Sequence, residues 1–217
     1  MDFERARFLM TQQQVRPWKV VDDRVLSVMG QLPREKFVPD HLQALAYSDT
    51  TLPIGHEQIM LTPKEQGRIA QALRLKPTDR VLEIGTGTGY LTAILASLAE
   101  HVTSVDIFED FVHEAKTRLN ELGIGNVSLC VGDAASGWSQ NERYDAIVIT
   151  GGLLAVPTSY KHALKEGGRL ICIIGQPPAM QVRLVERCDG EQFTDHGLFE
   201  TVVPLLVNAP EPARFTF

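Results

Sequence analysis

Apolar and polar positions alternate along the second half of this chain in a way that predicts a layered α/β fold. From position 80 onward, short apolar runs alternate with segments whose apolar residues recur every three or four positions, and these are the patterns of buried strands and of helices. Alternation at this spacing implies right-handed crossovers between parallel strands. The predicted strands are 80–84, 102–106, 127–131, 144–150 and 169–174, with later strands at 182–187 and 201–207; the predicted helices are 90–98, 111–122 and 157–164.

The first third of the chain follows a different pattern. Positions 1–32 carry apolar residues at helical spacing, whereas positions 33–61 have no regular period and are interrupted by prolines, which predicts irregular structure. A further helix is predicted to begin at Thr62, because Pro63 suits a first helical position and Glu65 completes a capping box. We therefore expect a single α/β domain, in which positions 1–75 form an N-terminal helical extension with a loop, positions 76–207 form the core and positions 208–217 form a loose tail.

Composition and charge exclude several classes of protein. The 217 residues are 44% apolar, which is enough to bury a core. The formal charge of −6 disfavours a broad surface for nucleic acid. We expect no membrane partner, because no apolar run approaches the length of a membrane span and the charged start lacks the apolar run of a secretory signal. Three cysteines without a CxxC pair predict neither a disulfide framework nor a zinc site, and they favour a cytoplasmic location.

The strongest local signal is a glycine-rich segment, Glu-Ile-Gly-Thr-Gly-Thr-Gly at positions 83–89, between a predicted strand and a predicted helix. Glycines there let the main chain turn tightly and approach a ligand closely. A dinucleotide loop would need glycine at position 90, which is Tyr90. The observed order resembles motif I of S-adenosylmethionine (SAM) methyltransferases. A carboxylate such as Glu83 would suit the cationic sulfonium and ammonium of that ligand; the alternative is a glycine turn with a structural acid.

Two more acidic residues follow the next two predicted strands. Asp106 ends its strand, where a carboxylate can accept hydrogen bonds from both ribose hydroxyls, and Asp133 lies where an acid binds the adenine amino group in methyltransferases. A solvated acid and a common Gly-Asp turn are the alternatives. Because ligands bind at the carboxyl ends of strands in open α/β sheets, these positions support one another. The predicted SAM contacts are Glu83, Gly85, Thr86, Gly87, Gly89, Asp106, Ile107, Asp133 and Ala134. The histidines form no HxxxH or HExxH pair, so no metal is expected.

Beyond the glycine loop, the chain resembles the protein-L-isoaspartate O-methyltransferase family over about positions 20–207. The matching stretches are 33–38, 52–55, 81–90, 132–133, 144–147, 167–168 and 203–205. The resemblance implies a Rossmann-like SAM methyltransferase sheet flanked by helices. It also implies methyl transfer from SAM to the carboxylate that is exposed when aspartate isomerises, after which the ester collapses to a succinimide. The partner would be a protein or peptide acceptor. An ionised carboxylate is already a nucleophile near neutral pH, so no strong base is required.

The resemblance implies that the loop at 54–62, called the acceptor loop below, covers the methyl group and receives the acceptor. One departure from that family lies in this loop. The family usually carries Thr-Ile-Ser after the Pro-Ile-Gly loop, whereas this chain has Ile-Met-Leu at 59–61, so that Leu61 replaces a catalytic hydroxyl. Thr62 is one position further on, where a helix cap explains it better. His56 could orient or deprotonate a substrate, or simply face solvent. We hypothesise that the cofactor half is retained and the acceptor half altered, with weak isoaspartyl activity surviving.

Three other functions stay open at this point. The first is a SAM-dependent methyltransferase with a different acceptor. The second is a SAM-binding protein without turnover. The third is a nicotinamide dehydrogenase, against which the glycine spacing argues. The sequence does not indicate an oligomeric state.

Overall fold

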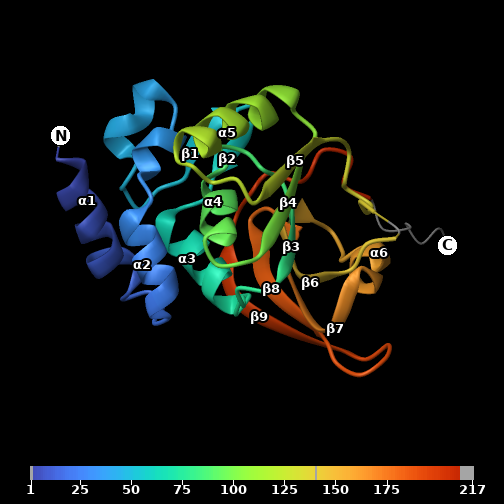
Figure 1. Cartoon of the computed structure of the whole chain (residues 1–217). Helices are drawn as coiled ribbons and strands as arrows, with labels where there is room; N and C mark the ends of the chain where they lie inside the picture. The colour runs from blue at the N-terminus through green and yellow to red at the C-terminus, as the bar shows by residue number, and fades with distance from the viewer. Residues whose placement is uncertain (1, 140, 211–217) are drawn as a thin grey trace.

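A seven-stranded sheet forms the centre of the computed structural model, which describes residues 2–139 and 141–210 (Figure 1). The strand order is β5-β4-β3-β6-β7-β8-β9, and the first five of these strands run parallel. The predicted α/β sheet is therefore confirmed. The strands are β3 (Arg80–Ile84), β4 (His101–Asp106), β5 (Val127–Val131), β6 (Tyr144–Leu153), β7 (Leu164–Gln176), β8 (Ala179–Arg187) and β9 (Phe193–Thr201).

Side chains of the parallel strands alternate between two buried faces. In β3, Val81 packs into the cluster that contains the N-terminal helices, whereas Leu82 packs into a second cluster with Tyr160. This is the period of two expected of a strand that is covered on both sides. The first face carries α3 (Pro63–Ala72), α4 (Tyr90–Ala96) and α5 (Glu109–Glu121), and the second carries α6 (Thr158–His162).

The N-terminal third packs beside the first face of the sheet, as predicted for a helical extension (Figure 1). Its helices are α1 (Phe3–Met10), which continues into the π-helical turn η1 (Thr11–Val15), α2 (Asp23–Gln31), and the 3₁₀ turns η2 (Arg34–Phe37) and η3 (Asp40–Leu45). The capping box predicted at the start of α3 is confirmed, because Glu65 accepts from the Thr62 N–H at 2.9 Å and its own N–H donates back to the Thr62 hydroxyl.

The expectation of irregular structure throughout 33–61 is wrong at its end, where β1 (Leu52–Gly55) and β2 (Gln58–Met60) form an antiparallel hairpin. The turn between them places Gly55, His56 and Glu57 at φ values of 106°, 48° and 58°. Residues other than glycine and asparagine seldom adopt positive φ, so the sequence lacks the usual hairpin signature. This hairpin contains most of the predicted acceptor loop.

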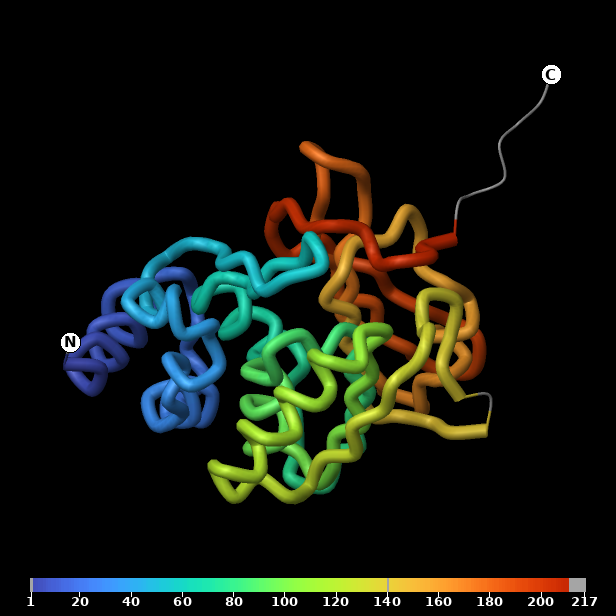
Figure 2. Tube along the Cα trace, turned by 90° about the horizontal axis from the view of Figure 1, so that it is seen from above, coloured from blue at the N-terminus to red at the C-terminus, as the bar shows by residue number. Residues whose placement is uncertain are grey.

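The expectation of a strand at 201–207 is also wrong. The last strand is β9, which ends at Thr201, and the next residues leave the sheet. Pro204 has no N–H to donate to a ladder, but its carbonyl accepts from the Gly152 N–H at 2.9 Å, and the Leu206 N–H donates to the Gly152 carbonyl at 2.9 Å. These bonds hold 203–207 across the carboxyl end of β6. In Figure 2 this red segment runs beside the cyan end of the hairpin.

Asn208 lies within the predicted tail, and its amide donates to the Asp133 carboxylate at 2.8 Å. Positions 211–217 of that tail lie outside the described residues. Within 2–139 and 141–210, no helix combines the length and the apolar character needed to cross a membrane.

Candidate functional site

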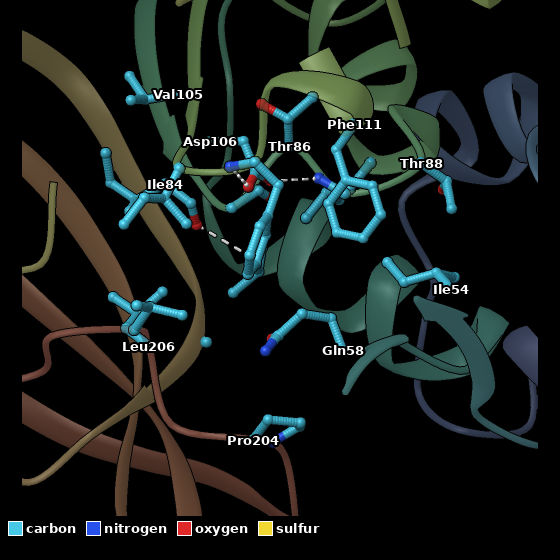
Figure 3. A pocket seen from close by; sticks show the side chains of 18 of the residues that line it. Ile54, Gln58, Ile84, Thr86, Thr88, Val105, Asp106, Phe111, Pro204 and Leu206 are labelled. Atoms are coloured by element: carbon cyan, nitrogen blue, oxygen red, sulfur yellow. Dashed lines mark hydrogen bonds between the residues drawn. The ribbon is translucent and has the colours of Figure 1, made fainter. Parts of the chain in front are cut away.

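A cavity lies at the carboxyl ends of the parallel strands and encloses about 880 Å³, including the part that is open to solvent. Its position matches the general rule for open α/β sheets, because the chain leaves β3 toward one edge of the sheet and leaves β6 toward the other. Figure 3 shows labelled side chains converging from the glycine loop, the end of β4, α5, the hairpin and the C-terminal segment.

The glycine loop forms one wall of this cavity. Gly85, Gly87 and Gly89 have φ values of 93°, 51° and 85°, so all three adopt a conformation that L side chains avoid. Gly85, Thr86 and Gly87 line the cavity, whereas Gly89 is the N-cap residue of α4. The structure therefore brings the predicted loop to the cavity, with Gly89 shaping the loop from behind.

Asp106 lies at the tip of β4 and lines the same cavity together with Ile107. One carboxylate oxygen accepts from the Gly87 N–H at 2.8 Å and the other from the Phe108 N–H at 3.1 Å (Figure 3). Burial raises the pKa of Asp106, and these backbone donors oppose that shift. An ionised carboxylate has about four acceptor positions. Asp106 therefore keeps positions for two further donors, as the ribose hydroxyls would require.

Asp133 and Ala134 lie at the cavity edge after β5. One oxygen of Asp133 accepts from the Ala135 N–H at 2.9 Å, and the other accepts from the amide of Asn208. The side chain is exposed and is held between the strand end and the C-terminal segment. It also keeps free acceptor positions, which an adenine amino group could use.

Glu83 is fully buried and is not among the residues that line the cavity. Position 83 lies on the same face of β3 as Val81, so its carboxylate points toward α4 and accepts from the Ser104 hydroxyl at 2.6 Å and from the Thr92 hydroxyl. Ser104 also bonds Thr86 at 2.6 Å. Burial raises the pKa of Glu83 to about 7, against the lowering effect of these two hydroxyls. Glu83 therefore supports the glycine loop through Ser104 and Thr86.

The three acceptor-side residues have different surroundings. Leu61 lines the cavity and is buried. Thr62 is buried in its helix cap, and it does not line the cavity. His56 is exposed at the hairpin turn, where its ring stacks on Phe108 at 4.1 Å between ring centroids and its Nε2 lies 2.8 Å from the Asp110 carboxylate. The structure thus brings Leu61 to the cavity but leaves His56 outside it, as an anchor between the hairpin and α5.

Several cavity residues were not among the individually predicted site residues, although some lie in the predicted loop or in stretches that match the family. They come from the hairpin, from the buried side of α3 and α4, from the middle of β6 and from the segment after β9. A turn signature would have revealed the hairpin, but His56 and Glu57 do not provide one. These residues are Ile54, Gln58, Gln66, Tyr90, Thr150, Val203, Pro204, Leu206 and Val207.

The charge of the cavity lining tests whether SAM fits. Among the described residues, the lining contains two carboxylates, Asp106 and Asp133, and no lysine, arginine or histidine. Two acids and no base suit a ligand with a cationic sulfonium and an ammonium. The lining therefore fits SAM, and the glycine spacing is what argues against a nicotinamide cofactor.

Comparison with protein families gives a match over residues 6–207 to the model described as protein-L-isoaspartate(D-aspartate) O-methyltransferase. Among curated relatives, a protein-L-isoaspartate O-methyltransferase of Opitutus terrae is 40% identical over 194 residues, which cover 87% of this chain and 83% of the relative. One of Serratia proteamaculans is 38% identical and covers 94% of this chain and 96% of the relative.

Solved structures show the same fold. A protein-L-isoaspartate O-methyltransferase structure superposes with a TM-score of 0.79 at 26% identity, covering 95% of this chain and 66% of that one. A putative enzyme of this type from Plasmodium falciparum, in complex with S-adenosyl-L-homocysteine, has a TM-score of 0.77 at 20% identity and covers 93% of this chain and 97% of that one. At that identity, the second likeness shows the fold alone.

Proposed function

This chain belongs to the protein-L-isoaspartate(D-aspartate) O-methyltransferase family, and from that premise we propose that it methylates the free carboxylate of isoaspartyl residues in damaged proteins or peptides. Like the family, it is an enzyme that uses S-adenosylmethionine. The observation that carries the proposal is the cavity at the strand tips, whose lining has two carboxylates and no cationic side chain among the described residues.

We propose that the predicted residues bind different parts of the cofactor. Asp106 accepts hydrogen bonds from the ribose hydroxyls, and Asp133 accepts one from the adenine amino group. Gly85 to Gly87 bring the main chain close to the ligand. Ile107 and Ala134 complete the walls, and Glu83 and Gly89 hold the loop in shape. The bound cofactor supplies an electrophilic methyl group on a cationic sulfur.

The acceptor enters between the hairpin and the C-terminal segment in this proposal. The carboxylate oxygen of the acceptor is the nucleophile and needs no base, because carboxyl groups titrate at about 3–4. The chain therefore has to orient this oxygen and exclude water, which Ile54, Leu61 and Val203 do with apolar surface. The position of His56 outside the cavity suits a role in anchoring the hairpin.

We also propose that positions 1–75 provide the acceptor side of the site and positions 76–207 the cofactor side. The reaction requires a protein or peptide partner with an exposed carboxylate. A cytoplasmic setting is proposed from cysteine usage, since Cys130, Cys172 and Cys188 are all free in the described structure.

Incubation with methyl-labelled SAM and a peptide pair tests the proposed function. The two peptides share one sequence and differ only in having isoaspartate or aspartate at one position. We expect base-labile label in the isoaspartyl peptide alone. Leu61→Ser should raise this rate by about 10- to 150-fold, because a hydrogen bond to a charged group contributes about 1.5–3 kcal/mol. Leu61→Ala is the matched control, since it removes the same side chain and adds no hydroxyl.

Two results would count against this function. Label in both peptides would show that the enzyme does not recognise isoaspartate. Label in neither peptide, with a different molecule labelled in a cell extract, would identify this chain as a methyltransferase for another acceptor. The apolar Leu61 in place of a hydroxyl is the observation that keeps this second candidate in view.

A further inference from the structure

A buried cation lies directly behind the acceptor side of the cavity. Arg34, at the start of η2, is 0% exposed. Its guanidinium donates to the Ala46 carbonyl at 2.7 Å, to the Leu61 carbonyl at 2.7 Å and to the Gln66 side-chain oxygen. Within the described residues, no carboxylate lies close enough to form an ion pair with it. Arg34 is therefore a charge that is hydrogen-bonded but makes no direct ion pair, and the Glu65 carboxylate acts on it only from a longer distance.

The charge on Arg34 persists near neutral pH. Burial lowers its pKa to about 10, which still leaves the guanidinium protonated. A buried charge without a direct ion pair is costly. It also acts strongly on an anion that comes close, because little water separates the two. Two of its three hydrogen-bond partners, Leu61 and Gln66, line the cavity.

Arg34 fixes the orientation of the Gln66 amide. A guanidinium only donates hydrogen bonds, so the end of the amide that faces Arg34 has to be the oxygen. The NH₂ group is therefore the other end. It has no hydrogen-bond partner within the described part of the chain, and the residue lines the cavity while being only 4% exposed. Gln66 thus presents an unpaired donor to the acceptor side.

Tyr90 provides a second unpaired group next to Arg34. Its ring lies under the guanidinium, with 4.8 Å from the Arg34 Cζ to the ring centroid. The Tyr90 hydroxyl is buried and has no hydrogen-bond partner among the residues described, and the residue lines the cavity. An unsatisfied buried hydroxyl costs free energy unless a ligand completes it. Two unpaired donors next to one cation form an arrangement that suits an oxyanion.

We propose that Gln66 and Tyr90, backed by Arg34, bind the carboxylate of the methyl acceptor and compensate in part for the hydroxyl that Leu61 lacks. This rests on the proposed function and names the residues that give the site its specificity for an anionic acceptor. The carboxylate is otherwise without a cation, since the cavity lining itself has none within the described residues. The Gln66 side chain and the Leu61 carbonyl bind one guanidinium, and both residues line the cavity.

The test measures peptide binding to the protein saturated with S-adenosyl-L-homocysteine (SAH). Fluorescence anisotropy follows a labelled isoaspartyl peptide and the same peptide with its isoaspartyl carboxylate amidated. Gln66→Glu keeps an oxygen that accepts from Arg34, but it places a negative charge toward the carboxylate of the acceptor. Gln66→Leu removes the N–H donor while keeping a side chain of similar volume. We expect each variant to weaken binding of the peptide with the free carboxylate at least about tenfold. The affinities for SAH and for the amidated peptide should change less than about twofold. Tyr90→Phe removes one hydroxyl and should weaken binding of the peptide with the free carboxylate about threefold or more.

The possible results separate the two proposals. Unchanged carboxylate-peptide affinity in the Gln66 variants and in Tyr90→Phe overturns the inference and leaves the proposed function standing. Weaker SAH binding with unchanged peptide binding also overturns the inference, because Gln66 and Tyr90 would then bind the carboxylate of the cofactor and not that of the acceptor. Failure of the wild-type protein to bind or methylate the isoaspartyl peptide overturns the proposed function, and the inference with it. Should the Gln66 variants not fold in a thermal melt, Tyr90→Phe alone decides.

Discussion

Replacing Asp106 by alanine is expected to weaken SAH binding at least about 100-fold. Each ribose hydroxyl that donates to the carboxylate contributes about 1.5–3 kcal/mol as a hydrogen bond to a charged group, and two such bonds would be lost. The substitution also removes the acceptors of the Gly87 and Phe108 N–H groups. The glycine loop and the β4–α5 turn would then lose the side chain that ties them together.

Calorimetric titration with SAH measures this loss. Asp106→Asn is the isosteric comparison and should fall between the wild type and alanine, because one amide oxygen can still accept hydrogen bonds. Glu109→Ala is the control, since Glu109 is an exposed acid three positions further on that does not line the cavity. An Asp106→Ala protein that binds SAH within fivefold of the wild type would contradict the assignment of the ribose site.

Replacing Gly85 by alanine is expected to weaken SAH binding about 30-fold or more. At φ 93°, alanine would be strained by about 1–2 kcal/mol. The added Cβ would also collide with the Thr150 hydroxyl, which donates to the Gly85 carbonyl at 3.0 Å. Overpacking of this kind costs about 1–3 kcal/mol. The loop must shift to relieve the collision, and the shift removes the close approach that the ligand requires.

Gly123→Ala separates strain from collision. Gly123 has φ 70°, and a Cβ built there meets nothing within 4 Å. This control should lower the thermal stability slightly and leave SAH affinity unchanged. The double substitution Gly85→Ala with Thr150→Ala should recover part of the lost affinity, because it removes the collision and keeps the strain. If Gly85→Ala binds SAH as tightly as Gly123→Ala does, the main chain at position 85 does not approach the ligand.

The sequence predicts the cofactor half of this molecule well, because that half depends on local patterns. Five parallel strands have apolar runs, the glycine loop directly follows one of them, and Asp106 ends another. The structure brings Gly85, Gly87, Asp106 and Asp133 to one cavity for this reason. Glu83 and Gly89 do not line the cavity. Gly89 is the N-cap residue of α4, and strand periodicity explains Glu83, which lies on the same face as Val81 and is therefore turned away from the cavity.

The acceptor half is predicted poorly, because it depends on contacts between distant segments. The hairpin turns at His56 and Glu57, whose positive φ values no local rule anticipates. The last edge strand, β9, is largely exposed and so lacks an apolar run. The pair formed by Arg34 and Gln66 joins positions 32 residues apart in the sequence. A buried arginine without a direct ion pair has no signature in the sequence alone.

Hydrogen–deuterium exchange with and without SAH tests most directly whether the cavity at the strand tips holds the cofactor. We predict that saturating SAH protects amides at 84–89, 105–108 and 132–135, which belong to three separate strand ends. Amides at 136–138 and 159–163, which line a different cavity, should exchange as before. Protection of that second region with no change at the glycine loop, or no protection anywhere, would contradict the account.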